Sequence, residues 1–230
     1  MVNTRAFIFA RGGSKGIKGK NLVSFKGQPL IAQSIFIAKE LNCIDKIYVS
    51  TDSKEIADIS RGYGVTVIKR PKNLAEDNSP EWLAWQHAIK YSLENDGNFS
   101  RFISLPTTSP LRIKSDVKKC LEALNHNIDI VITATQSRRN PWFNIITIDN
   151  EGNTKLLLKN SDNNFERRQD APAAYDLTTV AYVSTPKFII DNSRIWDGNV
   201  ATVLIPPERA LDIDTQFDLD FARWLSERKN

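Results

Sequence analysis

The chain has 230 residues, enough for one α/β domain whose core needs no disulfide or metal to hold it together. Its 31 basic and 27 acidic side chains give a net charge of +4, too balanced for a nucleic-acid surface, so we expect no nucleic-acid partner. The two cysteines form no CxxC or Cys/His cluster, residues 1–5 lack a signal-peptide layout, and no apolar stretch approaches the roughly 18 residues of a membrane span. These features predict a cytoplasmic protein without a membrane partner.

Short apolar runs alternate with helical patterns along the chain. The runs lie at 5–10, 46–50, 65–69, 101–105 and 128–134. Strands that alternate with helices pair in parallel through right-handed crossovers, so we expect an α/β fold with a mostly parallel sheet and helices on both faces. Helix starts are marked by Pro29 as a first-turn proline and by Ser53 and Thr215 as capping residues. We expect residues 1–230 to form a single domain.

A loop rich in glycines and cations follows the first predicted strand directly. Residues 10–22 contain four glycines and four cations. Backbone N–H groups of such a loop can crowd around phosphates while Arg and Lys neutralise them. The loop is neither a Walker A motif nor a GxGxxG fingerprint, and a solvated basic turn is the alternative interpretation. We expect it to bind a nucleotide through Ala10, Arg11, Gly12, Gly13, Ser14, Lys15, Lys20 and Asn21.

Polar residues also follow the third predicted strand, at the same expected edge of the sheet. Arg70 is suited to hold a carboxylate or phosphate, and Asp77 is suited to hold a ribose or base donor. The alternative is an ordinary salt bridge within a loop, which has little energetic value.

Three hydroxyl residues, Thr107, Thr108 and Ser109, follow the fourth predicted strand between Pro106 and Pro110. The prolines restrict the backbone, so the segment is expected to form a rigid polar wall where ligands of open α/β sheets bind. The same residues could instead form a turn that caps the next helix.

The pattern changes between about 136 and 172. Residues 144–148, a turn at 149–152 and residues 155–158 predict an antiparallel hairpin, which we interpret as an inserted arm. Arginine pairs at 138–139 and 167–168 flank this arm, where they either recognise an acidic sugar or remain solvated on the surface. The hairpin needs a surface on which to bury its apolar side chains, which predicts a homodimer through Trp142, Phe143, Ile145 and Leu157.

Two carboxylates, Asp212 and Asp214, lie near the C-terminus on either side of Ile213. An extended backbone directs both to one side, and Mg²⁺ prefers one or two carboxylates together with water and phosphate oxygens. The pair therefore complements the basic loop as a metal site. Alternatively, Asp214 is a neighbour of a helix cap and Asp212 is a surface charge.

A series of motifs spans nearly the whole chain, at 10–17 and 20–22, 50–53, 70–77, 108–112 and 212–215. Together these motifs resemble the CMP-sialic acid synthetase (acylneuraminate cytidylyltransferase) family. The resemblance implies a Rossmann-like, GT-A-like nucleotidyltransferase fold and a homodimer whose arm reaches the partner's site. It implies transfer of CMP from CTP to the anomeric hydroxyl of an acidic 2-keto sugar, with release of pyrophosphate and help from Mg²⁺.

The same resemblance assigns roles to individual residues. Arg11, Lys20, Asp212 and Asp214 would be catalytic, with the two aspartates holding the metal. Ser14 and Lys15 would contact the triphosphate, Asn21 the nucleotide side, and Arg70 and Asp77 would lie near the nucleotide. On the sugar side it implies contacts from Thr107, Thr108, Ser109, Arg168, Gln169 and Asp176.

Two residues depart from the family pattern. Pro106 stands where relatives that use sialic acid have glutamine, and Asp176 stands where they have an arginine that meets the sugar carboxylate. The second change reverses a charge beside an anion, so we expect a nonulosonate or related keto sugar acid other than N-acetylneuraminate.

Two other classes of function remain open. A GT-A glycosyltransferase also uses an Asp-x-Asp pair, although that pair normally falls in the middle of the chain. A non-catalytic nucleotide-binding protein would make the aspartates incidental.

Overall fold

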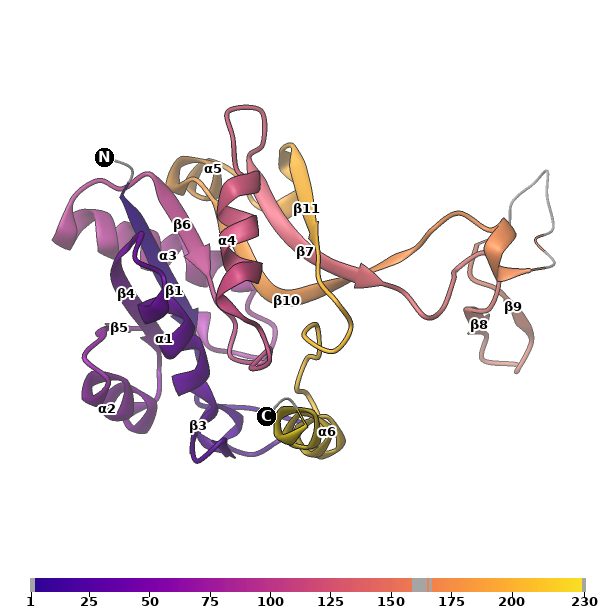
Figure 1. Cartoon of the computed structure of the whole chain (residues 1–230), viewed down its shortest axis with the longest axis horizontal. Helices are drawn as coiled ribbons and strands as arrows, with labels where there is room; N and C mark the ends of the chain where they lie inside the picture. The colour runs from indigo at the N-terminus through magenta and orange to yellow at the C-terminus, as the bar shows by residue number, and fades with distance from the viewer. Residues whose placement is uncertain (1–2, 159–164, 166, 229–230) are drawn as a thin grey trace.

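A single large sheet forms the body of the molecule (Figure 1). In the computed structural model, which describes residues 3–158, 165 and 167–228, this sheet has seven strands in the order β11-β7-β10-β6-β1-β4-β5. All neighbours pair in parallel except β10, which is antiparallel to β6 and β7. The strands are β1 (Thr4–Phe9), β4 (Ile44–Thr51), β5 (Thr66–Lys69), β6 (Arg101–Ser104), β7 (Ile130–Gln136), β10 (Tyr175–Ser184) and β11 (Val200–Leu204).

The five predicted strands are confirmed as β1, β4, β5, β6 and β7, with ends shifted by one or two residues. The sequence pattern did not identify β10 and β11. Strand β10 returns from the arm and pairs against the direction of its neighbours, so it is not part of the regular alternation of strand and helix.

The central strand β1 supplies two different cores because successive side chains of a strand point to opposite faces. Phe7 packs into an aromatic cluster with Tyr48, Trp85 and Phe102. Ala6 and Ile8 belong to an aliphatic cluster on the other face. Burial of both faces explains why β1 is a continuous apolar run without alternation.

Helices cover both faces of the sheet, as predicted. Helices α1 (Leu30–Glu40), α2 (Lys54–Gly62) and α4 (Lys114–Ala123) contribute to the aliphatic cluster. Helices α3 (Glu81–Asp96) and α5 (Pro186–Asp191) contribute to the aromatic cluster. Short 3-10 helices occupy Lys20–Leu22, Lys72–Leu74, Arg168–Asp170 and Ile195–Asp197, and a small ladder joins β2 (Ser24–Phe25) to β3 (Gln28–Pro29).

The C-terminal helix α6 (Gln216–Glu227) packs against the loop that follows β1 rather than against the sheet face. Its Leu219 and Ala222 form a third apolar cluster with Ile17, Phe25 and Ile213. Two predicted helix starts are confirmed: Ser53 accepts a hydrogen bond from the Ile56 N–H, and Thr215 and Asp218 cap each other reciprocally. Pro29 is the residue before α1, its N-cap, rather than part of the first turn. The packing of α6 carries Asp212 and Asp214 to the basic loop.

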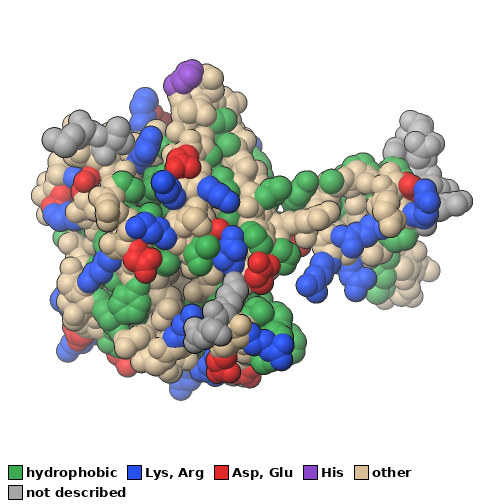
Figure 2. Space-filling model, in the orientation of Figure 1, with side chains coloured by type: hydrophobic (Ala, Val, Ile, Leu, Met, Phe, Trp, Pro, Cys, Tyr) green, Lys and Arg blue, Asp and Glu red, His purple; other side chains and the backbone are tan. Residues whose placement is uncertain are grey.

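The segment between β7 and β10 projects away from the body as an arm (Figure 1). The predicted hairpin is confirmed as β8 (Ile146–Ile148) paired antiparallel with β9 (Thr154–Leu156). Residues 159–164 and 166 of the predicted arm lie outside the described residues. In the described part, Trp142, Phe143 and Ile145 are half-buried, whereas Ile146, Ile148, Leu156, Leu157 and Leu158 are exposed. Figure 2 shows Lys and Arg side chains gathered along the underside of the arm.

The helices among the described residues are all too short or too polar to cross a bilayer.

Candidate active site

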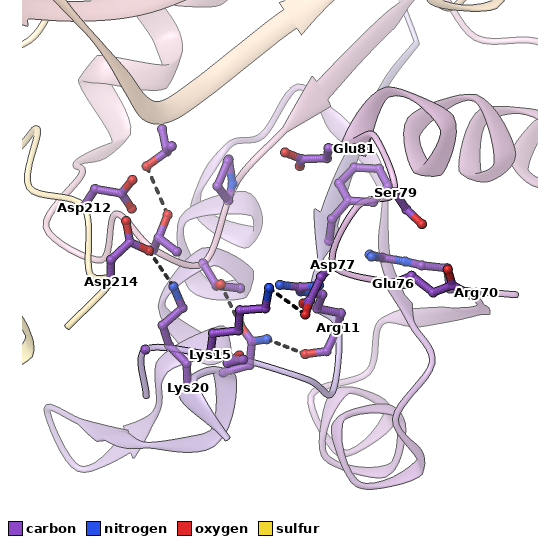
Figure 3. Close-up of a pocket in the computed structure, with 18 of the residues that line it drawn as sticks. Arg11, Lys15, Lys20, Arg70, Glu76, Asp77, Ser79, Glu81, Asp212 and Asp214 are labelled. Carbon is purple, nitrogen blue, oxygen red and sulfur yellow. Dashed lines mark hydrogen bonds and ion pairs between the residues drawn. The ribbon is translucent and has the colours of Figure 1, made fainter. Parts of the chain in front are cut away.

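A cavity of about 450 Å³ opens at the carboxyl ends of β1, β5 and β6, where the loop after β1 meets the segment before α6 (Figure 3). It brings together residues that are more than 200 positions apart in the sequence. Its lining consists of Phe9, Arg11, Ser14, Lys15, Gly16, Lys20, Asn21, Arg70, Leu74, Glu76, Asp77, Ser79, Glu81, Pro106, Thr107, Thr108, Thr179, Asp212 and Asp214.

Two cations of the loop share one carboxylate. Arg11 Nη1 lies 2.7 Å from Asp77 Oδ1, and Lys15 Nζ lies 2.8 Å from Asp77 Oδ2. The hydrogen bonds from Lys15 and Arg11 hold the pKa of Asp77 below its usual value. Of the two interpretations of Asp77, the structure therefore supports the salt bridge. Asp77 sets the position of two cations at the cavity wall, and its oxygens are occupied by them.

Asn21 braces the loop from beneath. It is buried, its Nδ2 donates to the Arg11 carbonyl at 2.9 Å, and its Oδ1 accepts from Thr107 Oγ1 at 2.6 Å. Asn21 also lines the cavity, so its contact with a nucleotide stays a prediction. The loop is also anchored by the Gly12 N–H, which donates to Asp52 Oδ1 at 2.9 Å.

Three predicted nucleotide contacts lie beside the cavity and do not line it: Ala10, Gly12 and Gly13. Ala10 is buried and its N–H donates to the Ser50 carbonyl at 3.1 Å, so it extends the pairing of β1 with β4. The other loop residues named as nucleotide contacts do line the cavity, and their contact with a nucleotide stays a prediction: Arg11, Ser14, Lys15, Lys20 and Asn21.

Lys20 and Gly16 join the basic loop to the acidic segment. Lys20 Nζ donates to the Ile213 carbonyl at 2.8 Å and lies 3.0 Å from Asp214 Oδ1. Gly16 approaches the Asp214 backbone so closely that a Cβ at this position would lie 1.9 Å from the Asp214 carbonyl oxygen. Only glycine fits here without displacement of one segment from the other.

The two aspartates point into the cavity, as predicted for an extended backbone. Ile213 is fully buried between them, and its N–H donates to the Thr108 carbonyl at 2.8 Å. Asp212 Oδ1 is buried and accepts no hydrogen bond from the described residues, while the Asp214 side chain is 70% exposed. A buried carboxylate oxygen without a donor is suited to a cation.

The residues present therefore fit a magnesium ion. Within the described part of the chain, no group of three or more His, Cys, Asp or Glu side chains is placed to hold a metal by itself. Mg²⁺ commonly binds one or two carboxylates and completes its shell with water and substrate phosphates. Asp212 and Asp214 would supply the protein ligands.

A cluster of hydroxyl groups lies beside the aspartate pair, since the Thr108 carbonyl accepts the hydrogen bond of the Ile213 N–H. Thr179 Oγ1 lies 3.0 Å from Thr108 Oγ1 and 2.7 Å from Ser109 Oγ. Thr107 and Thr108 line the cavity, as predicted, whereas Ser109 is fully buried behind them. The register of β10 shifts between Thr178 and Val183, and this irregularity brings Thr179 to the cavity. Sequence reasoning missed Thr179, because strand periodicity alone does not reveal a bulge.

The arm carries the remaining predicted sugar contacts away from this cavity within one chain (Figure 1). Arg168 and Gln169 line a separate recess of about 460 Å³ on the arm, beside Arg139 and Asn140. Asp176 pairs with Thr135 near the base of the arm and is exposed. A single chain therefore does not unite these three residues with the aspartate pair.

Sequence reasoning also missed cavity residues from the loop after β5 and the start of α3. Ser79 and Glu81 line the cavity, and neither belongs to a motif with a known spacing. The only local signal is their position after Arg70, at a loop that ends a parallel strand.

The sheet topology and the pairing of a basic loop with two aspartates define an α/β nucleotidyltransferase. Residues 6–225 match the cytidylyltransferase family, and the chain belongs to this family, which confirms the predicted resemblance.

Three known proteins illustrate the similarity. The chain is 34% identical to the CMP-N,N'-diacetyllegionaminic acid synthase of Campylobacter jejuni over 97% of this chain and 94% of that protein. It is 30% identical to a pseudaminic acid cytidylyltransferase of Campylobacter jejuni, over 95% of this chain and 94% of the relative. The structure of CMP:2-keto-3-deoxy-manno-octonic acid synthetase complexed with CTP shares the fold, with a TM-score of 0.73, 15% identity and coverage of 99% of this chain and 100% of the other.

Proposed function

We propose that this chain transfers CMP from CTP to the anomeric hydroxyl of a nonulosonate-type 2-keto sugar acid and releases pyrophosphate. The observation that carries the proposal is the single cavity in which three cations of the loop after β1 meet the pair Asp212 and Asp214. Membership of the cytidylyltransferase family supports CTP as the nucleotide.

The chain's own residues would perform charge stabilisation and positioning. Arg11, Lys15 and Lys20 bind the triphosphate, and they neutralise the charge that develops on the departing pyrophosphate. Asp212 and Asp214 would hold Mg²⁺, which when bound polarises phosphate oxygens and favours the deprotonated sugar hydroxyl. Ile213, anchored to Thr108, keeps both carboxylates turned toward the cavity.

For the acceptor we propose a sugar acid of the legionaminate or pseudaminate type. Relatives of 34% and 30% identity carry these substrates in their names, whereas an N-acylneuraminate cytidylyltransferase of Streptococcus agalactiae is 28% identical. Pro106 has no side-chain amide to donate, and Asp176 would repel a carboxylate. The hydroxyls of Thr108 and Thr179 offer donors and acceptors for a differently substituted sugar.

We further propose that the chain acts as a homodimer. The recess with Arg168 and Gln169 lies on the arm, outside the cavity of its own chain. An arm supplied by a second copy would place these side chains beside the partner's cavity, where a guanidinium could bind the sugar carboxylate.

The test is a comparison of kcat/KM with CTP and Mg²⁺ for N-acetylneuraminate, legionaminate-type, pseudaminate-type and Kdo-type acids, with pyrophosphate as the readout. We expect pyrophosphate, with N-acetylneuraminate disfavoured by an order of roughly 10² because mismatched polar groups in a closed site are costly. Production of nucleoside diphosphate from a nucleotide sugar would indicate a glycosyltransferase, and no product at all would indicate a binding protein. If N-acetylneuraminate were the best acceptor, the interpretation of Pro106 and Asp176 would be wrong.

A further inference from the structure

The cavity has two unlike halves. On one side lie the cations of the loop after β1, of which Lys20 pairs with Asp214, whereas Arg11 and Lys15 pair with Asp77. The other side has apolar surface from Phe9 and Leu74 and polar groups from Arg70, Ser79 and Glu81. Figure 3 shows Glu81 and Ser79 together on the side of the cavity away from Lys20. The first half suits phosphates and the second suits a flat heterocycle with polar edges.

Glu81 is an exposed acceptor that a buried tryptophan orients. It is the first residue of α3, and its Oε1 accepts a hydrogen bond of 3.1 Å from Trp85 Nε1. Trp85 itself is buried in the aromatic cluster. The other carboxylate oxygen, Oε2, accepts no hydrogen bond from the described residues and remains available to a ligand in the cavity. Glu81 and the aspartate pair are not placed as a group of three metal-binding side chains among the described residues.

Arg70 is a donor fixed in the same half of the cavity. It is buried, its Nε donates to Ser50 Oγ at 3.1 Å, and its Nη2 donates to the Ser50 carbonyl at 2.8 Å. The guanidinium carbon lies 5.6 Å from the centre of the Phe9 ring. Nη1 donates to none of the described residues. Glu81 and Arg70 thus offer one acceptor and one donor, both held by buried neighbours.

We propose that Glu81 selects cytosine by accepting a hydrogen bond from the exocyclic 4-amino group of CTP. This inference rests on the proposed function. Cytosine presents a 4-amino donor beside two acceptors, N3 and O2, which match the acceptor of Glu81 and a donor such as Arg70. Uracil presents a carbonyl oxygen where cytosine has the amino group. That oxygen would face the Glu81 carboxylate, acceptor against acceptor, so UTP is rejected.

The test measures equilibrium binding of CTP and UTP, each with Mg²⁺, to the wild-type chain, Glu81→Gln and Glu81→Ala. Wild type should prefer CTP by roughly 10- to 100-fold, the value of one well-placed hydrogen bond to a charged group. Glutamine can accept from an amino group or donate to a carbonyl, so Glu81→Gln should lose most of this preference. Glu81→Ala should lose CTP affinity and gain none for UTP. Glu94→Gln, on the same helix but outside the cavity, is the control and should keep the wild-type ratio.

A second measurement removes the group from the ligand and needs no variant. The triphosphate of the pyrimidin-2-one ribonucleoside is CTP without its 4-amino group. Wild type should bind this analogue more weakly than CTP, by the same factor by which Glu81→Ala weakens the binding of CTP. The affinity of Glu81→Ala should be the same for the analogue and for CTP.

The inference would be overturned if a folded Glu81→Gln variant kept the wild-type ratio of CTP affinity to UTP affinity. It would also be overturned if wild type bound CTP and the analogue equally well. These readouts involve no sugar. Absence of pyrophosphate with every acceptor would overturn the proposed function and leave the binding result to be judged separately.

Discussion

In the cavity, Arg11, Lys15 and Lys20 each have an acidic partner from a distant part of the chain, whereas on the arm Ile146, Ile148 and Leu157 face solvent. The cavity is therefore organised before any ligand arrives, since its cations are already held at fixed places. The arm is a two-stranded hairpin with an apolar surface that its own chain leaves uncovered. One chain therefore pairs the cations of its cavity by itself and leaves apolar side chains of its arm exposed.

The largest expected effect tests whether the cavity acts through its aspartate pair. We expect Asp212→Ala and Asp214→Ala each to lower Mg²⁺-dependent kcat/KM by about 10³-fold, because loss of the metal removes several kcal/mol of charge stabilisation. Both carboxylates border the cavity rather than the apolar core, so the variants should fold and show little change in Tm.

Asp220→Ala is the matched control, because Asp220 is an exposed carboxylate on α6 outside the cavity. It should keep wild-type turnover across a magnesium titration. Wild-type turnover in both cavity variants would remove the metal pair from the site.

The parts of this cavity that the sequence predicted are those set by neighbouring residues. The loop after β1 is one continuous segment of the sequence, and Asp212 and Asp214 lie within another. Strand geometry alone places the two carboxylates on one side. The caps of α2 and α6 are likewise local. These features need no knowledge of what packs against them.

The parts that were missed depend on contacts between distant segments. Asp77 carries the right chemistry for a ribose, but only the fold reveals that Arg11 and Lys15 occupy its oxygens. Thr179 reaches the cavity through a shift in register that periodicity does not encode. The placement of Glu81 depends on a tryptophan in the aromatic cluster, so its role follows from packing rather than from a motif.

A second prediction tests how tightly the basic loop must sit against the acidic segment. We expect Gly16→Ala to lower kcat/KM by about 10²-fold, because an added methyl group displaces the loop or Asp214 by a distance on the order of 1 Å. The collision is with a backbone oxygen, 1.9 Å from the added Cβ, and a rotamer change cannot relieve it.

The control for this substitution is Gly62→Ala, since a Cβ on Gly62 meets nothing within 4 Å and the residue lies at the end of α2, away from the cavity. It should leave turnover unchanged. Normal kinetics of Gly16→Ala would show that the cavity tolerates movement and is less rigid than its ion pairs indicate.

The smallest expected effect concerns the arm and tests whether its exposed apolar face is covered by a second copy of the chain. Ile148 is 65% exposed and shares one face of the hairpin with Ile146 and Leu156, so a second copy of the chain is expected to cover it. Wild type should sediment as a dimer at micromolar concentration, and Ile148→Asp should weaken association by about tenfold, the cost of roughly 1.4 kcal/mol for a charge in an apolar contact. Asn150→Asp adds the same charge at the exposed turn and should leave association unchanged.

Since Ile148 contributes little to the core of its own chain, Tm measured at low concentration should be equal in all three proteins. A wild-type monomer at micromolar concentration would mean that the arm is complete alone, and the contrast between arm and cavity would then need another explanation.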